Sequence, residues 1–263
     1  MQHYLDTHAH LVQILDDGIM GRSELEKLLS GGFGPIIDIG TRAEDLCPRV
    51  RVLGDLPGVY FSAGIWPYKE DFSHPAERVA LLEEGLSCAP AGRLVAIGEA
   101  GLDRWHNKAE DGTDLAGERE LFARQADLAR RLDLPLIVHS REDAEGTLEV
   151  LEGFPGLKMV IHCYSYGVEE ARRFLDLGAF ISFSGTITYK NARAQQEAAR
   201  FVPLESLLVE TDAPYLAPVP YRGKKNRPDY IGASFDMIAQ LRGMDTDTLC
   251  HAIRENTRDI FGI

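Results

Sequence analysis

Residues 134–140 and 157–164 read LPLIVHS and LKMVIHCY. Each is a short, apolar, β-branched run that reaches a histidine near its end, and the residues between them follow a helical pattern over about 143–152. Near-continuous apolar runs are typical of parallel strands covered on both faces. Parallel neighbours need a crossover connection, usually a helix. This stretch therefore predicts a strand, helix, strand unit.

The same unit recurs along the chain. The eight apolar runs are HYLDTH, PIIDIG, VYFSAGI, LVAIGEA, LPLIVHS, LKMVIHCY, AFISFSG and LLVETDA. Helical patterns cover about 23–30, 74–86, 114–132, 143–152, 168–177, 191–202, 235–241 and 246–261. Eight alternating strands and helices in 263 residues predict an α/β fold, a (β/α)8 TIM barrel forming a single domain over residues 1–263. An open doubly wound sheet is the alternative.

Several residues predict local details of the helices. In the helix at 114–132, Leu121, Gln125, Leu128 and Leu132 share one face, with Ala129 beside them. Ser23 and Glu26 resemble a capping box. Gly178 predicts the end of the helix at 168–177. Asn191 predicts an N-cap for the helix at 191–202.

Composition narrows the class of protein. The chain is 44% hydrophobic and 26% charged, which is ordinary for a globular domain, and its formal charge is −13. That charge argues against broad adhesion to nucleic acid or anionic membranes, although it leaves room for a local basic patch. We expect no signal peptide, no membrane span and a cytoplasmic location. The four cysteines are far apart, which predicts reduced thiols.

Residues that bind metals stand at the ends of five predicted strands. They are His8, His10, Glu99, His139, His162 and Asp212. A (β/α)8 barrel places functional residues at the carboxyl ends of its strands, so these six side chains should meet. Imidazole and carboxylate ligands suit Zn²⁺, Mn²⁺, Fe²⁺ or Mg²⁺. Six ligands exceed one tetrahedral site, so we expect two divalent ions, about 3.5–4 Å apart, sharing a bridging carboxylate.

The chain resembles a known family, the TatD-related metal-dependent hydrolases, a branch of the amidohydrolase-like barrels. The stretches that carry the resemblance are LDTHAHL, AIGEAGLD, LPLIVHSRE, VIHCYS, FISFSGTITYKNA and LLVETDAPYLAPVPYRGKKNRP. The resemblance runs from Tyr4 to about Asn256. It implies a (β/α)8 barrel with one or two divalent ions and deoxyribonuclease activity, often from the 3′ end of single strands.

The resemblance also assigns roles to the six ligands. His8, His10 and Asp212 would hold one ion, His139 and His162 the other, and Glu99 would bridge them. Asp212 would be the catalytic base. Many related amide and lactone hydrolases bridge their ions with a carboxylated lysine, so the glutamate favours the nuclease branch.

Two stretches depart from the family pattern. The usual Gly-x-His-Pro-His after the third strand reads GIWPYKED here, so Trp66 and Tyr68 replace both histidines. After the sixth strand, HCYSYG is one residue longer than the family's usual stretch and places Tyr164 and Tyr166 there. These departures change the loops that face the substrate.

Other residues are candidates for contact with the substrate. They are Trp66, Asp103, Arg222, Lys224, Lys225 and Arg227. Trp66 would stack on a base, and the four basic residues, from the run RGKKNR, would bind phosphates. Asp6 and Glu210 could hold ligating imidazoles or belong to a polar layer inside the barrel. Residues 104–117 are either a partial lid or a passive loop.

The sequence therefore predicts a divalent-metal-dependent hydrolase acting on ester bonds. The leading interpretation is a deoxyribonuclease or phosphodiesterase whose partner is the end of a single-stranded DNA or a short oligonucleotide. One alternative is ester or amide hydrolysis, for example on aminoacyl-RNA, and another is a non-catalytic metal-binding scaffold. No membrane partner and no obligate protein partner are expected.

Overall fold

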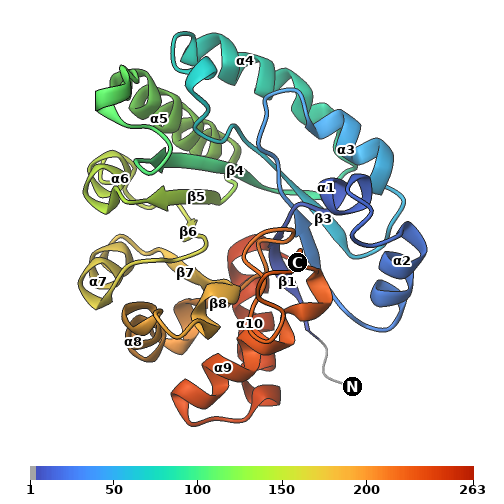
Figure 1. Cartoon of the computed structure of the whole chain (residues 1–263). Helices are drawn as coiled ribbons and strands as arrows, with labels where there is room; N and C mark the ends of the chain where they lie inside the picture. The colour runs from blue at the N-terminus through green and yellow to red at the C-terminus, as the bar shows by residue number, and fades with distance from the viewer. Residues whose placement is uncertain (1–3) are drawn as a thin grey trace.

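Eight parallel strands in chain order form the centre of the molecule, shown in Figure 1. The computed structural model describes residues 4–263. The strands are β1 (Asp6–Ala9), β2 (Ile36–Asp38), β3 (Val59–Ala63), β4 (Leu94–Asp103), β5 (Leu136–Arg141), β6 (Met159–Ile161), β7 (Phe180–Phe183) and β8 (Leu207–Val209). The residues after β8 close the sheet on β1, because Asp212 N donates to His8 O at 2.9 Å and His10 N donates to Ala213 O at 2.8 Å. The predicted (β/α)8 barrel is confirmed, and the open sheet is wrong.

The helices lie around the strands (Figure 1). They are α1 (Leu11–Asp16), α2 (Arg22–Ser30), α3 (Leu46–Leu53), α4 (Pro75–Gly85), α5 (Leu115–Leu132), α6 (Ala144–Leu151), α7 (Val168–Asp176), α8 (Arg193–Phe201), α9 (Gly232–Arg242) and α10 (Thr246–Phe261). Sequence patterns missed α1 and α3. The first has only six residues, and the second contains Pro48 in its first turn, where a missing N–H is tolerated.

Some predicted details of the helices hold and others do not. Gly178 has φ +83° just after α7, as expected for a helix stop. Ser23 lies inside α2, whose N-terminus is instead closed by Glu24 accepting from Gly21 N at 2.8 Å, so the predicted capping box is wrong. Asn191 is not the cap of α8, because the N-cap position falls on Ala192.

The predicted inward face of α5 is largely correct. Leu121, Gln125, Leu128 and Ala129 are buried, whereas Leu132 is exposed because the helix ends there. The buried Gln125 amide accepts from Ile65 N at 2.7 Å and donates to Ile65 O at 3.0 Å. It thereby fixes the backbone that leads out of β3 toward the mouth of the barrel.

The expectation of four reduced thiols is wrong for one pair. Cys47 and Cys88 form a disulfide across a Cα–Cα distance of 5.2 Å, while Cys163 and Cys250 are free. Forty-one positions separate the bonded pair, so only the approach of α3 to the segment after α4 reveals it. Among residues 4–263, no helix is long and apolar enough to cross a membrane. The cytoplasmic location stays a prediction.

A buried ion pair holds the β2 side of the barrel. Arg49 Nη1 lies 2.7 Å from Asp38 Oδ2, with both side chains almost fully buried. The same guanidinium donates to Ser62 O at 2.6 Å, and Asp38 accepts from Leu11 N at 2.8 Å. One pair therefore connects β2, β3, α3 and the start of α1.

We expect Arg49→Ala to reduce the free energy of unfolding by about 3–5 kcal/mol, because it leaves the Asp38 carboxylate buried without its cation. Chemical denaturation measures this change. The control is Arg51→Ala, an exposed arginine of the same helix, which should change stability by less than about 0.5 kcal/mol. Equal effects of the two variants would contradict a stabilising role for the buried pair.

Candidate metal centre

Glu99 reaches the mouth of the barrel from within β4. The sequence placed it at the end of the fourth strand, but β4 continues to Asp103, so that expectation is wrong. The pairing with β5 slips between Ile97, which pairs with Leu136, and Ala100, which pairs with Val138. The extra residue in β4 is a bulge, a device that redirects a side chain. It lies at the Gly98–Glu99 segment.

Glu99 lies among four imidazoles. Its Oε1 is 2.7 Å from His139 Nδ1 and 2.9 Å from His162 Nε2, and its Oε2 is 3.4 Å from His8 Nε2 and 4.0 Å from His10 Nε2. One carboxylate oxygen thus faces each pair of histidines. This is the arrangement that a bridging ligand requires.

Asp212 completes the cluster next to the first pair of histidines. Its Oδ1 lies 3.6 Å from His8 Nε2 and 3.4 Å from His10 Nε2. The residue has φ +55°, a left-handed conformation that costs free energy for a non-glycine residue and is common at functional sites. Two overlapping groups have ligand spacing: His8 with Glu99 and His162, and His8 with His10 and Asp212. These are two candidate metal sites.

His8 provides a test of whether the cluster suits a cation. The side chain is 1% exposed, and among residues 4–263 neither ring nitrogen has a hydrogen-bond partner. Burial lowers its pKa, so the ring is neutral and Nε2 can offer a lone pair beside two carboxylates. A buried polar atom without a partner costs free energy. A divalent ion between His8 and these oxygens removes that cost, and the residues therefore fit a metal.

Neighbouring carboxylates fix the ring orientation of the second pair of histidines, His139 and His162. Asp103 Oδ2 lies 2.9 Å from His139 Nε2, and Glu210 Oε1 lies 3.3 Å from His162 Nδ1. Burial opposes ionisation of Asp103, but His139 and His106 outweigh it and hold the pKa of Asp103 below its ordinary value. An ionised carboxylate only accepts, so His139 carries a proton on Nε2 toward Asp103, and Nδ1 is the ring nitrogen that faces Glu99 and the candidate metal sites.

Asp6 and Glu210 differ in what they hold. Glu210 contacts an imidazole, one of the two roles that the sequence allowed. Asp6 instead accepts from Thr211 N at 2.9 Å, Thr211 Oγ1 at 2.5 Å and His8 N at 3.2 Å. Burial raises the pKa of Asp6 to about 7. Asp6 therefore ties β1 to the segment after β8 and belongs to the polar layer inside the barrel.

A cavity of about 560 Å³ opens above the cluster. Its wall includes Trp66, Tyr68, His106, Arg141 and Tyr215. The Trp66 ring centroid is 5.5 Å from that of His139 and 5.3 Å from that of His106. Trp66 thus stands beside the ligands, where a flat substrate group could contact it.

The sequence reasoning missed some of these lining residues. Arg141 stands two positions after His139 in β5, and alternate residues of a strand face the same side. That spacing was a signal for Arg141. Tyr215 and His106 lie on loops, where periodicity carries no such signal, and only the structure shows that they line the cavity.

The predicted substrate contacts occupy different places. Asp103 lines the cavity, but it is fully buried. Its carboxylate contacts both His139 and His106, and its Oδ2 lies 2.8 Å from His106 Nδ1. The basic run lies outside the residues that line the cavity. Arg227 pairs with Asp229 at 2.9 Å, Lys225 lies 3.8 Å from Asp17, and Arg222 stacks 4.4 Å from the centre of the Tyr189 ring, while Lys224 is exposed. Phosphate binding by this run stays a prediction.

The segment at 104–117 is anchored at several points. Arg104 pairs with Glu118 and, at 3.0 Å, with Asp143. Asn107 is buried and donates to Pro67 O at 2.8 Å. Trp105 is 48% exposed. Whether the segment acts as a lid stays a prediction.

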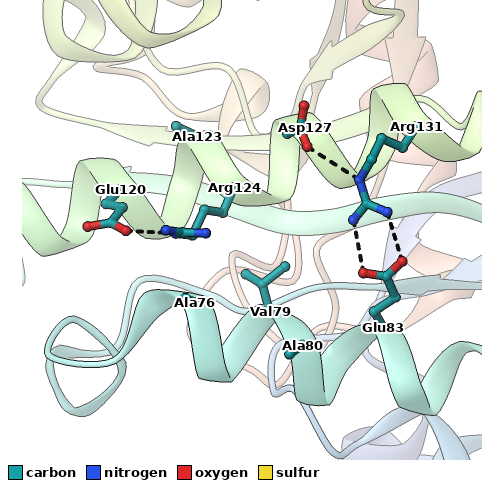
Figure 2. Close-up of a pocket in the computed structure, with 9 residues that line it drawn as sticks. All are labelled: Ala76, Val79, Ala80, Glu83, Glu120, Ala123, Arg124, Asp127 and Arg131. Atoms are coloured by element: carbon teal, nitrogen blue, oxygen red, sulfur yellow. Dashed lines mark hydrogen bonds and ion pairs between the residues drawn. The ribbon is translucent and has the colours of Figure 1, made fainter.

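A second hollow lies between α4 and α5 (Figure 2). Its charged side chains bind one another: Arg131 reaches Glu83 at 2.8 Å and Asp127 at 3.3 Å, and Arg124 reaches Glu120 at 2.7 Å. Small residues, Ala76, Ala80 and Ala123, line the rest. The Arg131–Glu83 pair joins the two helices on the outer surface of the barrel, whereas the other two pairs lie within α5, so we assign this hollow to helix packing.

Comparison with known proteins identifies the family. The TatD related DNase family model matches residues 5–262. The chain belongs to the TatD-related DNase family. It is a metal-dependent hydrolase with an amidohydrolase-like barrel. It is 37% identical to the uncharacterized metal-dependent hydrolase YcfH of Escherichia coli K12, over 81% of this chain and 77% of YcfH.

Two further TatD-family relatives match almost end to end. The uncharacterized metal-dependent hydrolase YabD of Bacillus subtilis is 30% identical over 98% of both chains. The crystal structure of the TatD homologue YjjV from E. coli K12 is 30% identical, with a TM-score of 0.87 over 100% of this chain and 99% of that one.

We expect Glu99→Gln to weaken divalent-metal binding at least about 100-fold, because the amide removes the negative charge that lies between the two pairs of histidines. Titration of the metal-free protein with Mn²⁺ or Zn²⁺, with elemental analysis, measures the affinity and the ions held per chain. The far-UV circular dichroism should not change. Glu84→Gln, an exposed substitution on α4, is the control. Unchanged metal content in Glu99→Gln would contradict the bridging role.

Proposed function

We propose that this TatD-family hydrolase is a phosphodiesterase that cleaves at the ends of single-stranded DNA or short oligonucleotides, using two divalent ions per chain. The observation that carries the proposal is the position of Glu99 between two pairs of histidines. A carboxylate shared in this way suits paired ions, which are typical of phosphoryl-transfer sites. Membership of a family described as DNases supports the same substrate class.

The residues divide the chemistry among them. When bound, the ions supply a nucleophilic water and offset charge on the phosphoryl oxygens. Asp212 borders the cavity, which supports a role as the acceptor of the proton of the attacking water. Attack forms one P–O bond and breaks the P–O bond to the leaving group, which yields a phosphate monoester and an alcohol. Glu99 and the four histidines would hold the ions.

The cavity wall suits a nucleotide. Trp66 and Tyr68, with ring centroids 4.7 Å apart, present aromatic surface beside the cluster. Stacking of a base on such a ring contributes about 1–3 kcal/mol and tolerates any sequence. Trp66 and Tyr68 replace the two histidines of the family's usual motif, so this part of the wall offers aromatic rings for a base in place of imidazoles.

Activity against defined substrates tests the proposal. The chelator-stripped protein is reloaded separately with Mg²⁺, Mn²⁺, Zn²⁺ and Fe²⁺ and given single-stranded oligonucleotides labelled at either end, the matching duplex, and a panel of carboxylic esters and amides. We expect metal-dependent shortening of the single strand from one end. Hydrolysis of the esters without shortening of DNA would favour carbonyl chemistry, and no turnover with any metal would favour a binding role.

The basic run supplies a separate prediction. If Arg222, Lys224, Lys225 and Arg227 contact phosphates, Lys224→Gln with Lys225→Gln should weaken oligonucleotide binding. It should also flatten the salt dependence by up to about 0.7 in log–log slope for each lost contact.

Fluorescence anisotropy at several salt concentrations measures that slope. Lys27→Gln with Lys158→Gln removes two charges at the opposite end of the barrel and is the matched control. If the two double variants have the same slope, the run is a solvated loop.

A further inference from the structure

Arg141 is an exposed cation at the cavity mouth with no acidic partner. It is the only arginine or lysine among the residues that line the cavity, and across residues 4–263 it forms no ion pair. The arginine before Trp105 is different, because Arg104 is bound by Glu118 and Asp143. A protein of net charge −13 has ample carboxylates to neutralise Arg141. Its charge is therefore available to an anionic ligand that enters the cavity.

The guanidinium is nevertheless held in place. Arg141 Cζ lies 4.4 Å from the centre of the Trp105 ring, in a cation–π contact. The backbone is fixed as well, since Arg141 ends β5 opposite Asp103 and its carbonyl accepts from Arg104 N at 2.9 Å. An arginine fixed by stacking keeps its planar donors free for a ligand and loses less entropy when it binds one.

Its position relative to the metal cluster sets the geometry of the ligand. Arg141 and His139 are alternate residues of β5 on the same face, so their Cα atoms are about 6.6 Å apart along the strand. Both side chains line the same cavity, so an anion bound at Arg141 would lie next to a group bound at the cluster. Among the described residues that line the cavity, Arg141 is the only arginine or lysine, so it is the permanently charged cation there that can receive a second anion.

We propose that Arg141, held against Trp105, binds the phosphate that neighbours the scissile one. The preferred substrate then carries at least two phosphates separated by one nucleoside. A guanidinium suits this role because its fork of N–H donors matches two phosphate oxygens. The inference rests on the proposed phosphodiesterase function and narrows its substrate class.

Paired small substrates test the inference. Thymidine 5′-(p-nitrophenyl phosphate) is compared with the same ester carrying a 3′-phosphate, and thymidine 3′-(p-nitrophenyl phosphate) with the same ester carrying a 5′-phosphate. In at least one polarity, the second phosphate should raise kcat/KM on the order of tenfold, the usual effect of a hydrogen bond between charged groups. Arg141→Gln should remove that advantage, and it should change kcat/KM for the one-phosphate ester by no more than about twofold.

Three variants separate binding from a structural effect. Arg141→Lys keeps the positive charge but loses the forked N–H donors of the guanidinium. It should retain part of the higher kcat/KM for the two-phosphate ester. Trp105→Ala releases the guanidinium and should raise KM for the two-phosphate ester with kcat unchanged. Arg51→Gln, an exposed arginine at the far end of the barrel, should change neither substrate. Equal losses on both esters in Arg141→Gln would overturn the inference.

A binding measurement distinguishes failure of this inference from failure of the proposed function. Thymidine 3′,5′-bisphosphate and the two thymidine monophosphates are titrated into metal-loaded protein, followed by calorimetry and by fluorescence of the chain's two tryptophans. The bisphosphate should bind about tenfold tighter than either monophosphate, and only in the presence of Arg141. If the bisphosphate binds more tightly but no substrate is cleaved, the phosphate subsite at Arg141 stands and the phosphodiesterase function is rejected. Turnover without that preference, or no nucleotide binding, would reject the subsite.

Discussion

The buried carboxylate of Glu99 is the constraint on which the site depends. It is 4% exposed, and burial alone would raise its pKa. His162, His139 and His8 instead lower the pKa of Glu99 well below its ordinary value. An ionised carboxylate at this depth persists only if positive charge or strong donors surround it. Four strands, β1, β4, β5 and β6, must therefore bring Glu99 and these histidines to one point.

Close backbone packing makes that convergence possible. A Cβ on Gly64 would lie 2.3 Å from the carbonyl carbon of Gly98, and a Cβ on Gly101 would lie 1.8 Å from His139 O. At these two positions a side chain would force β3, β4 and β5 apart. The bulge at Glu99 and the proximity of β5 thus depend on the absence of side chains around it.

The metal centre and the mouth above it follow different rules. The six candidate ligands lie on strands of the barrel or on the residues that follow them. The mouth is built from Trp66, Tyr68, Trp105 and Arg141, which lie on or next to loops. Residues at the strand ends determine which reaction class is available, whereas the loop residues determine which substrate fits. This division is typical of (β/α)8 barrels.

The sequence by itself determined the barrel and the identity of the six candidate ligands. Both are local signals, since apolar runs mark strands and ligand-type residues stand in or close after these runs. Only the tertiary structure decided contacts between segments that are distant in sequence. It joined Cys47 to Cys88, placed Glu99 on a bulge within β4, and turned the Asp103 carboxylate toward two imidazoles.

The basic side chains also show the difference between what the sequence reveals and what the fold decides. A basic run such as RGKKNR is visible in the sequence, yet its partners are not, and the fold places acidic residues beside two of its members. Arg141 is a single residue without local signal of charge clustering. Its contact with Trp105 follows from the pairing of β4 with β5, which sets Arg141 opposite Asp103 and beside the segment that follows it. Sequence determines which charges exist, and packing determines which of them remain free to bind a ligand.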